Sequence, residues 1–359
     1  MRILVVNAGS SSLKLRLLGA DDVVEASWDA LPATLPDVDV VVHRVVHGGT
    51  AFRRAVIVDD DVENALHDLI PFAPLHQPKT LAALDDVRAM LPRAVRVACF
   101  DTAFHANIGA AAATYALPRE WIAKYGLRRY GFHGLSHAWA SRRTVALVPG
   151  ARRIITCHLG AGASLCAVRD GVSIDTTMGF TPLEGLVMAT RSGDVDPGLL
   201  MWLAQREPNL ADVLDHHSGL KGLAGTGDMR ELLARDDDDA QLGVEVYLHR
   251  LRKAIGSMAA SLGGLDVCVF TGGVGENSSD IRRRTIEGLG FLGLTVDIKA
   301  NAAPTGDADI SAAQAAARTF VIAAREDLEM ARQARQLLGI SGAALRAPAL
   351  DVPVVVSPD

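Results

Sequence analysis

Short apolar runs that stop at polar or glycine-rich segments recur along the chain. The runs that predict buried strands are Ile3–Val6, Val38–Val42, Val95–Phe100, Ile154–Cys157, Asp266–Phe270 and Thr319–Ala323. The segments with helical apolar spacing are Val62–Leu69, Thr80–Leu91, Gly243–Leu262 and Glu326–Leu338, and Asp21–Pro36 reads as irregular. Strands that alternate with helices predict an α/β fold, in which side chains at the carboxyl ends of strands reach a crevice.

Two of these runs begin the same pattern at distant points of the chain. Ile3–Val6 leads to Asn7, a Gly-Ser turn and a second apolar run, and Ile154–Cys157 leads to His158, a Gly-rich turn and another run. The second turn is expected to be one residue longer. Glycine leaves backbone N–H groups open to phosphate oxygens, although glycine turns are also common in ordinary hairpins. The repeat predicts two related halves that hold a nucleotide between them.

Polar side chains collect at the predicted strand ends and in the loops that follow them. This set comprises Asn7, Arg44, Asp101, His133, His158, Arg191, Asp228, Arg230 and Glu326. Separated arginines and carboxylates, with glycine turns that lack a Gly-Lys-Ser/Thr loop, indicate phosphoryl transfer outside the P-loop class. His133 and His137 also have the i, i+4 spacing of a zinc pair, but the accompanying glutamate is absent and Gly134 weakens a helix there.

Composition narrows the class of protein further. The chain has 359 residues, of which 49% are hydrophobic and 22% charged, and this length favours two domains. A net charge of -6 argues against nucleic acid or a membrane surface as partner. No apolar stretch is long enough for a membrane span, and the N-terminus lacks a secretory core, so we expect a cytoplasmic protein.

The motifs at these positions resemble those of the acetate kinases, in the wider superfamily of acetate and sugar kinases, Hsp70 and actin. The resemblance runs from Asn7 to about Ala334. The segments that carry it are Asn7–Lys14, His43–Gly49, Phe100–His105, Arg129–His137, Met178–Gly185 and Gly272–Asn277.

The resemblance implies a reversible transfer of the ATP γ-phosphoryl group to acetate, giving acetyl phosphate and ADP, with Mg²⁺ or possibly Mn²⁺. The catalytic residues it implies are Arg44, Asp101, His133 and Arg191. The acyl pocket it implies comprises Arg44, Val46, Leu75, Phe132 and Pro182. The nucleotide residues it implies are Lys14, His158, Gly160, Gly162, Asp228, Arg230, Gly273, Gly275 and Asn277, and the metal residues are Asn7 and Glu326.

The same resemblance implies the architecture and the oligomeric state. It predicts two ribonuclease-H-like, actin-like ATPase domains that arose by internal duplication, with the active site in the cleft between them. We assign 1–103 together with 326–359 to an N-terminal acetokinase domain, and 104–325 to a C-terminal nucleotide-binding and dimerisation domain. A homodimer is expected.

Two alternatives stay open at this stage. One is a kinase for propionate, because a single methylene in an apolar pocket discriminates by only about 1–3 kcal/mol. The other is a catalytically weakened nucleotide-binding paralogue. Two departures from the family motifs suggest it: Ala161 stands where an asparagine is usual, and Arg325 adds a positive charge beside Glu326.

Overall fold

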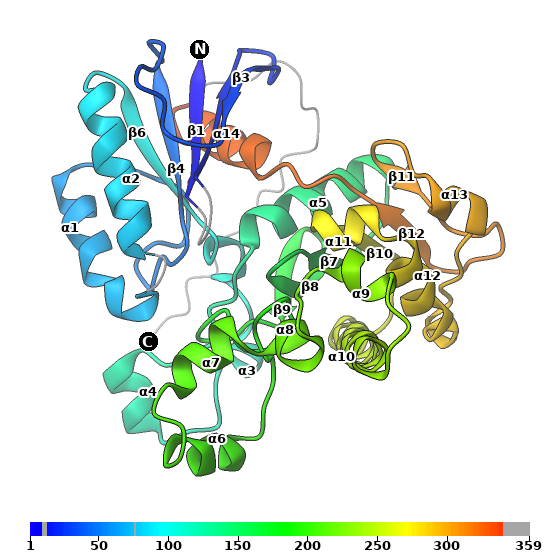
Figure 1. Ribbon diagram of the computed structural model, residues 1–359. Coiled ribbons are helices and arrows are strands. Elements are labelled where there is room, and N and C mark those ends of the chain that lie inside the picture. The colour runs from blue at the N-terminus through cyan, green and yellow to red at the C-terminus, as the bar shows by residue number, and fades with distance from the viewer. Residues whose placement is uncertain (9–12, 75–76, 340–359) are drawn as a thin grey trace.

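Two six-stranded sheets form the centre of the protein (Figure 1). The structure is a computed structural model that describes residues 1–8, 13–74 and 77–339. The N-terminal sheet contains β1 (Ile3–Ala8), β2 (Leu13–Leu18), β3 (Val24–Trp28), β4 (Val40–Val45), β5 (Val56–Ile57) and β6 (Val95–Phe100). The C-terminal sheet contains β7 (Arg153–Leu159), β8 (Ala163–Arg169), β9 (Val172–Thr176), β10 (Val267–Thr271), β11 (Ala308–Asp309) and β12 (Arg318–Val321).

The two sheets have the same strand order. It runs β3-β2-β1-β4-β6-β5 in one and β9-β8-β7-β10-β12-β11 in the other. Each sheet begins with an antiparallel meander, continues with parallel strands and ends in a short antiparallel edge strand. The predicted duplication of an α/β unit is therefore confirmed. The predicted turn lengths were wrong, because four residues separate β1 from β2 and three separate β7 from β8.

Helices cover both faces of each sheet. They are α1 (Asp60–Asp68), α2 (Gln77–Met90), α3 (Ala110–Ala113), α4 (Arg119–Tyr125), α5 (Gly134–Leu147), α6 (Pro197–Ala204), α7 (Leu210–His216), α8 (Gly219–Ala224), α9 (Met229–Leu233), α10 (Asp238–Leu262), α11 (Gly272–Asn277), α12 (Ser279–Glu287), α13 (Ile298–Ala302) and α14 (Glu326–Leu337). No helix in the described part of the chain is both long and apolar enough to cross a membrane.

Helix α5 lies between the two sheets and α14 packs beside it (Figure 1). Leu135 of α5 shares a core with α14 and with strands β1, β4 and β6, whereas Ala140 of α5 packs against strands of the C-terminal sheet. Glu329 of α14 is completely buried and pairs with Arg142 of α5 and Arg332. The last helix thus returns to the first sheet, which places the start of α14 next to the ends of β1 and β4.

Two segments differ from the sequence-based expectations. The stretch predicted to be irregular contains β3, whose residues are mostly exposed and therefore lack a strong apolar pattern. The glycine-rich segment after β10 forms the short helix α11 instead of an open turn. The tail from Ser341 lies outside the described residues.

Candidate active site

Arg44 and Asp101 form a buried ion pair at the carboxyl edge of the N-terminal sheet. Arg44 lies in β4, and Asp101 directly follows the neighbouring parallel strand β6. The guanidinium donates from Nε to Oδ1 at 2.9 Å and from Nη2 to Oδ2 at 2.6 Å. Burial lowers the pKa of Arg44, but Asp101 and Glu326 outweigh this effect and raise it, so the guanidinium remains charged.

Asn7 and Glu326 extend this pair into a network. Arg44 Nη1 donates to the Asn7 side-chain oxygen at 3.0 Å, and the Asn7 amide donates to Glu326 Oε2 at 3.0 Å. Asn7 comes from β1 and Glu326 is the first residue of α14. The network therefore joins residues that are up to 319 positions apart in the sequence.

His133 and His158 lie side by side next to this network, because the backbone N–H of Gly134, which follows His133, donates to the carbonyl of Asp101 at 2.9 Å. Their ring centroids are 4.4 Å apart; Nδ1 of His133 contacts Ser164 Oγ at 2.9 Å, and Nδ1 of His158 contacts Ser136 Oγ at 2.7 Å. Burial, aided by nearby Arg44, lowers the pKa of both rings. Both are therefore neutral near pH 7 and can each donate one N–H.

Gly162 lies beside His133 and Arg191. A Cβ added at Gly162 would lie 3.2 Å from His133 Nε2 and 3.5 Å from Arg191 Nη1. Arg191 is oriented from the other side, because its Nε donates to Asp215 Oδ1 at 2.5 Å. Gly160 lies nearby, since its added Cβ would be 3.7 Å from His158 Nε2. The second glycine turn thus faces two neutral imidazoles and a guanidinium.

A pocket of about 250 Å³ opens beside His158, between the two sheets. Its walls combine Val5, Asn7, Lys14 and Arg16 from the N-terminal sheet with His158, Gly272, Gly273, Glu276, Ala324, Glu326 and Asp327. Arg325 does not neutralise Glu326, because its guanidinium pairs with Asp327 at 2.9 Å. The predicted Lys14, His158, Gly273 and Glu326 therefore share one pocket.

The other residues predicted to bind the nucleotide lie outside this pocket. Asp228 caps α9 and pairs with Arg230, a residue that is 90% exposed. Asn277 donates its side-chain amide to the Gly273 carbonyl at 2.8 Å, and Gly275 is buried in the same short helix. The structure links Asn277 to Gly273 but gives no contact between that pair and Asp228.

Three of the acyl-pocket residues have different surroundings. Val46 and Phe132 are 5% and 1% exposed and belong to one apolar cluster, whereas Pro182 is half-buried in the loop after β9. His47, next to Val46, packs its ring 5.5 Å from Phe132 and 4.5 Å from Tyr130. Leu75 lies outside the described residues.

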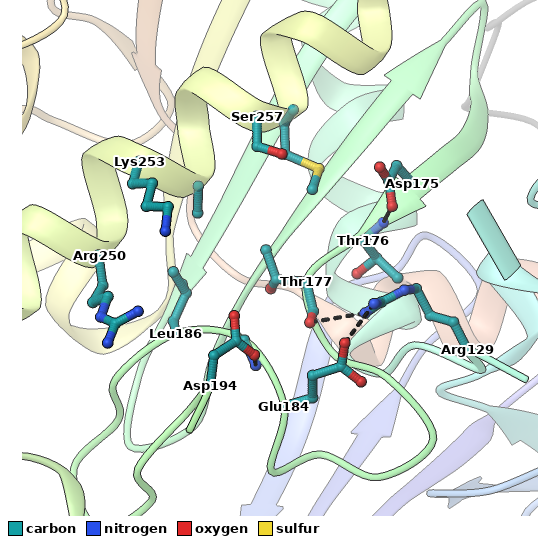
Figure 2. A pocket seen from close by; sticks show the side chains of 13 residues that line it. Arg129, Asp175, Thr176, Thr177, Glu184, Leu186, Asp194, Arg250, Lys253 and Ser257 are labelled. Carbon is teal, nitrogen blue, oxygen red and sulfur yellow. Dashed lines mark hydrogen bonds and ion pairs between the residues drawn. The ribbon is translucent and has the colours of Figure 1, made fainter. Parts of the chain in front are cut away.

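A second pocket, of about 240 Å³, lies between α10 and the loop that follows β9 (Figure 2). On its wall Arg129 donates to the carbonyl of Thr177 at 3.1 Å and pairs with Glu184 at 2.5 Å. Tyr115 also donates to Glu184 at 2.5 Å and accepts from the backbone N–H of Phe180. None of the predicted site residues in the described ranges lines this pocket. The contacts of Arg129 and Tyr115 instead hold the loop that carries Pro182 in place.

Several residues that complete the site were not predicted as functional. Ser136, Ser164 and Asp215 each contact a predicted residue directly, and Arg16 lines the pocket beside Lys14. Serine and aspartate are frequent; Ser136 lies within the motif segment Arg129–His137, but Ser164 and Asp215 stand in a strand and a helix with no motif of their own. Among the described residues, no three His, Cys, Asp or Glu side chains cluster as a ready-made metal site, and His133 and His137 bond to hydroxyl groups instead.

Buried histidines predict how stability depends on pH. Burial lowers the pKa of His43 to about 3 and of His47 and His105 to about 4. The unfolded chain takes up these protons below about pH 6.5 and the folded protein does not, so stability is lost as pH falls from 6.5 towards 4. Each histidine contributes a slope of about 1.4 kcal/mol per pH unit. Urea unfolding, followed by tryptophan fluorescence at pH 7.5, 6.5 and 5.5, measures how the free energy of unfolding depends on pH. The His105→Gln variant should show a shallower dependence. Equal stability of the wild type at all three pH values would refute the prediction.

Comparisons with known proteins agree with this arrangement. The model of the acetokinase family matches residues 29–332. The acetate kinase of Nostoc punctiforme is 46% identical over 315 residues, which are 85% of this chain and 78% of that protein. The crystal structure of Porphyromonas gingivalis acetate kinase aligns with a TM-score of 0.86 at 33% identity, over 94% of this chain and 99% of that one. A propionate kinase from Francisella tularensis aligns with a TM-score of 0.85 at 33% identity, over 92% and 98%. The resemblance and the predicted fold are thus confirmed, and this chain belongs to the acetokinase family, the phosphotransferases with a carboxyl group as acceptor.

Proposed function

We propose that this protein transfers the γ-phosphoryl group of ATP to acetate, reversibly, at the edge where the two sheets meet. The observation that carries this proposal is that Arg191 and His133 meet at Gly162, with His158 stacked beside His133 and the Arg44–Asp101 pair next to it. These groups match what a carboxylate and a polyphosphate need in order to react. Similar acetate kinases support the choice of acetate.

The chemistry requires charge neutralisation more than a strong base. A small carboxylic acid has a pKa of about 4 to 5, like Asp and Glu side chains, so it is already a nucleophilic anion at pH 7. The main obstacle is repulsion between that anion and the phosphates. Arg44 and Arg191 offset this repulsion, and neutral His133 and His158 donate hydrogen bonds without a change of protonation state.

The donor set at the start of α14 suits Mg²⁺. Asp101 and Glu326 offer carboxylate oxygens, and Asn7 offers an amide oxygen. Arg44 bonds to both Asp101 and Asn7, and Asn7 bonds in turn to Glu326. Oxygen ligands and retained waters are what Mg²⁺ prefers. When bound, the ion would neutralise charge on the β- and γ-phosphates. Lys14 and Arg16, on β2, supply further positive charge to the pocket beside His158, which Asn7 and Glu326 also line.

The proposal includes a division into two domains and their closure. The packing of α14 on β1, β4 and β6 supports an N-terminal domain of 1–103 with 326–359 and a C-terminal domain of 104–325. Asp228, Arg230, Gly275 and Asn277 belong to the adenosine side in this proposal. Closure of the cleft would bring them towards the nucleotide and exclude water, a competing acceptor of the phosphoryl group. A cytoplasmic location stays a prediction.

Acyl phosphate formation tests the proposed reaction directly. The protein is incubated with Mg-ATP and separately with acetate, propionate and butyrate, and the product is trapped with hydroxylamine. We expect product from acetate at the highest rate. Binding of ATP with no product from any acid would contradict the proposal and favour the weakened paralogue.

Val46 is predicted to set the preference between acetate and propionate. It is buried beside Phe132, so Val46→Ala would open space for one more carbon. We expect the propionate-to-acetate ratio of kcat/KM to rise by about 10-fold or more, since one methylene is worth about 1–3 kcal/mol. The control is Val56→Ala on the edge strand β5, because Val56 packs in a different apolar cluster from Val46 and Phe132. An unchanged ratio would remove Val46 from the pocket.

A homodimer is the proposed assembly, with helix α6 in the interface. Leu199, Met201 and Trp202 of this helix are 46%, 66% and 53% exposed, an unusual density of large apolar side chains on a surface. We expect Met201→Glu to shift the protein towards monomer in sedimentation velocity experiments. Leu242→Glu, on the exposed side of α10, serves as the matched control. A wild-type protein that sediments as a monomer at micromolar concentration would contradict the proposal.

A further inference from the structure

A chain of buried hydrogen bonds holds His133 from behind. Ser164 Oγ lies 2.9 Å from Nδ1 of His133 and 2.8 Å from Nε2 of His137. Nδ1 of His137 in turn lies 2.7 Å from Oγ1 of Thr156. Ser164, His137 and Thr156 are each 0% exposed. The chain thus runs from β7 through α5 and β8 to the ring that faces the glycine turn.

The number of available protons determines which group donates in each of these hydrogen bonds. Each neutral imidazole has one N–H, and each hydroxyl has one proton to donate. If Nδ1 of His137 carried the proton, it would donate to Thr156, and the Thr156 hydroxyl would then need another acceptor. Within the described residues this hydroxyl has no other partner. Since buried donors are normally satisfied, Thr156 donates to His137, His137 Nε2–H donates to Ser164, and Ser164 donates to Nδ1 of His133.

This order of donors and acceptors places the single ring proton of His133 on Nε2. Nδ1 accepts from Ser164, so the single ring proton must be on the other nitrogen. That nitrogen is the one near Gly162, where an added Cβ would lie 3.2 Å from it and 3.5 Å from Arg191. Both rings resist protonation, because burial and neighbouring histidines lower the pKa of His133 and of His137. The proton therefore points into the space shared with Arg191.

We propose that Ser164, His137 and Thr156 are positioning residues that lock His133 in the Nε2–H tautomer, so that it donates to the transferring phosphoryl group. This inference rests on the proposed function. The opposite tautomer would direct a nitrogen lone pair at phosphoryl oxygens and repel them. This series of hydrogen bonds from Thr156 through His137 and Ser164, here called the relay, thus determines whether His133 attracts or repels the transferring phosphoryl group.

A second buried histidine supplies a matched control. His105 Nε2 lies 3.1 Å from the carbonyl oxygen of Phe132, which can only accept, and Nδ1 lies 2.8 Å from Ser173 Oγ. The carbonyl alone fixes this tautomer. Ser173→Ala therefore removes a buried hydroxyl from a histidine Nδ1, as Ser164→Ala does, but it removes no hydrogen bond of His133, His137, Ser164 or Thr156.

The test compares tautomer and turnover in the full-length protein. Nitrogen-15 NMR of histidine-labelled protein, with the His133 signals assigned from His133→Ala, reports which ring nitrogen carries the proton. We expect Nε2–H in the wild type and a mixture of tautomers in Ser164→Ala and Thr156→Val. With ATP and acetate, kcat should fall about 10- to 100-fold in Ser164→Ala while the KM for acetate stays unchanged. Ser173→Ala should retain the wild-type kcat.

His137→Gln provides a rescue that a purely structural role would not predict. A glutamine amide can donate to Ser164 while its carbonyl accepts from Thr156, so kcat should stay within a few-fold of wild type, whereas His137→Leu should lose as much as Ser164→Ala. A wild-type His133 protonated on Nδ1, or a Ser164→Ala variant with unchanged kcat, would overturn the relay. The NMR result needs no turnover, so it tests the relay even if the wild type forms no acyl phosphate, an outcome that would refute the proposed function alone.

Discussion

Replacing Arg191 by alanine is expected to lower kcat about 10³- to 10⁵-fold, the range for an arginine that stabilises a transferring phosphoryl group. Asp215 holds one side of this guanidinium through Nε at 2.5 Å, and Nη1 faces Gly162 near His133. Nη1, which also contacts Met188 Sδ at 4.0 Å, thus borders the space where we propose that the phosphoryl group lies. Arg191→Lys should be nearly as severe, because an ammonium cannot contact Asp215 and the phosphoryl oxygens in one planar fork.

The hydroxylamine assay with Mg-ATP and acetate measures this loss, and circular dichroism confirms folding. Arg93→Ala is a suitable control, because that side chain is 89% exposed and pairs only weakly with Asp37 at 4.0 Å. Asp215→Asn should fall between wild type and Arg191→Ala, since it keeps a hydrogen-bond acceptor but loses the charge. Near-normal turnover in Arg191→Ala would remove this residue from the site.

Asp101→Asn is expected to reduce kcat by about 10²-fold or more and also to destabilise the fold. Asp101 is 1% exposed and accepts two hydrogen bonds from Arg44, so its neutralisation leaves a buried guanidinium without its counter-charge. Breaking a buried pair from one side costs about 3–5 kcal/mol. Activity would fall because Arg44 loses its fixed orientation and the site loses a carboxylate.

A double variant separates the two effects of Asp101. In Arg44→Gln with Asp101→Asn, both charges are gone and the two amides can bond to each other, so most of the unfolding free energy should return. Turnover should not return, because neither the cation nor the carboxylate is restored. Urea unfolding and the hydroxylamine assay measure the two quantities separately. A double variant that regained activity would show that the pair is structural only.

Strand ends in the sequence predicted much of the geometry of the candidate site. Arg44, Asp101 and His158 each occur where a buried apolar run becomes polar, and the structure places all three at the edges of the two sheets that face one cleft. The physical reason is that parallel strands end together, so their final side chains meet. The duplicated order of the sheets followed from the repeated pattern around Asn7 and His158.

The partners of these residues could not be predicted in the same way. Asp215 orients Arg191 across 24 positions, and Ser164 bonds to His133 across 31 positions. Such pairs depend on how helices and strands pack in three dimensions, and no local spacing reveals them. Strand β3 was missed for another reason: Val24 and Glu25 are exposed, so the segment lacks the apolar pattern by which a buried strand is recognised.

The matching registers of the two hairpins explain how the site became asymmetric. One step before its turn, the first hairpin places Asn7 opposite Lys14, and the second places His158 opposite Ser164. These are equivalent positions in sheets of the same order, yet one pair carries an amide and a cation and the other an imidazole and a hydroxyl. Two identical subunits related by symmetry would have to carry the same side chains at both places. With both copies in one polypeptide, each can change independently, so the two equivalent positions can carry different chemistry in a single molecule.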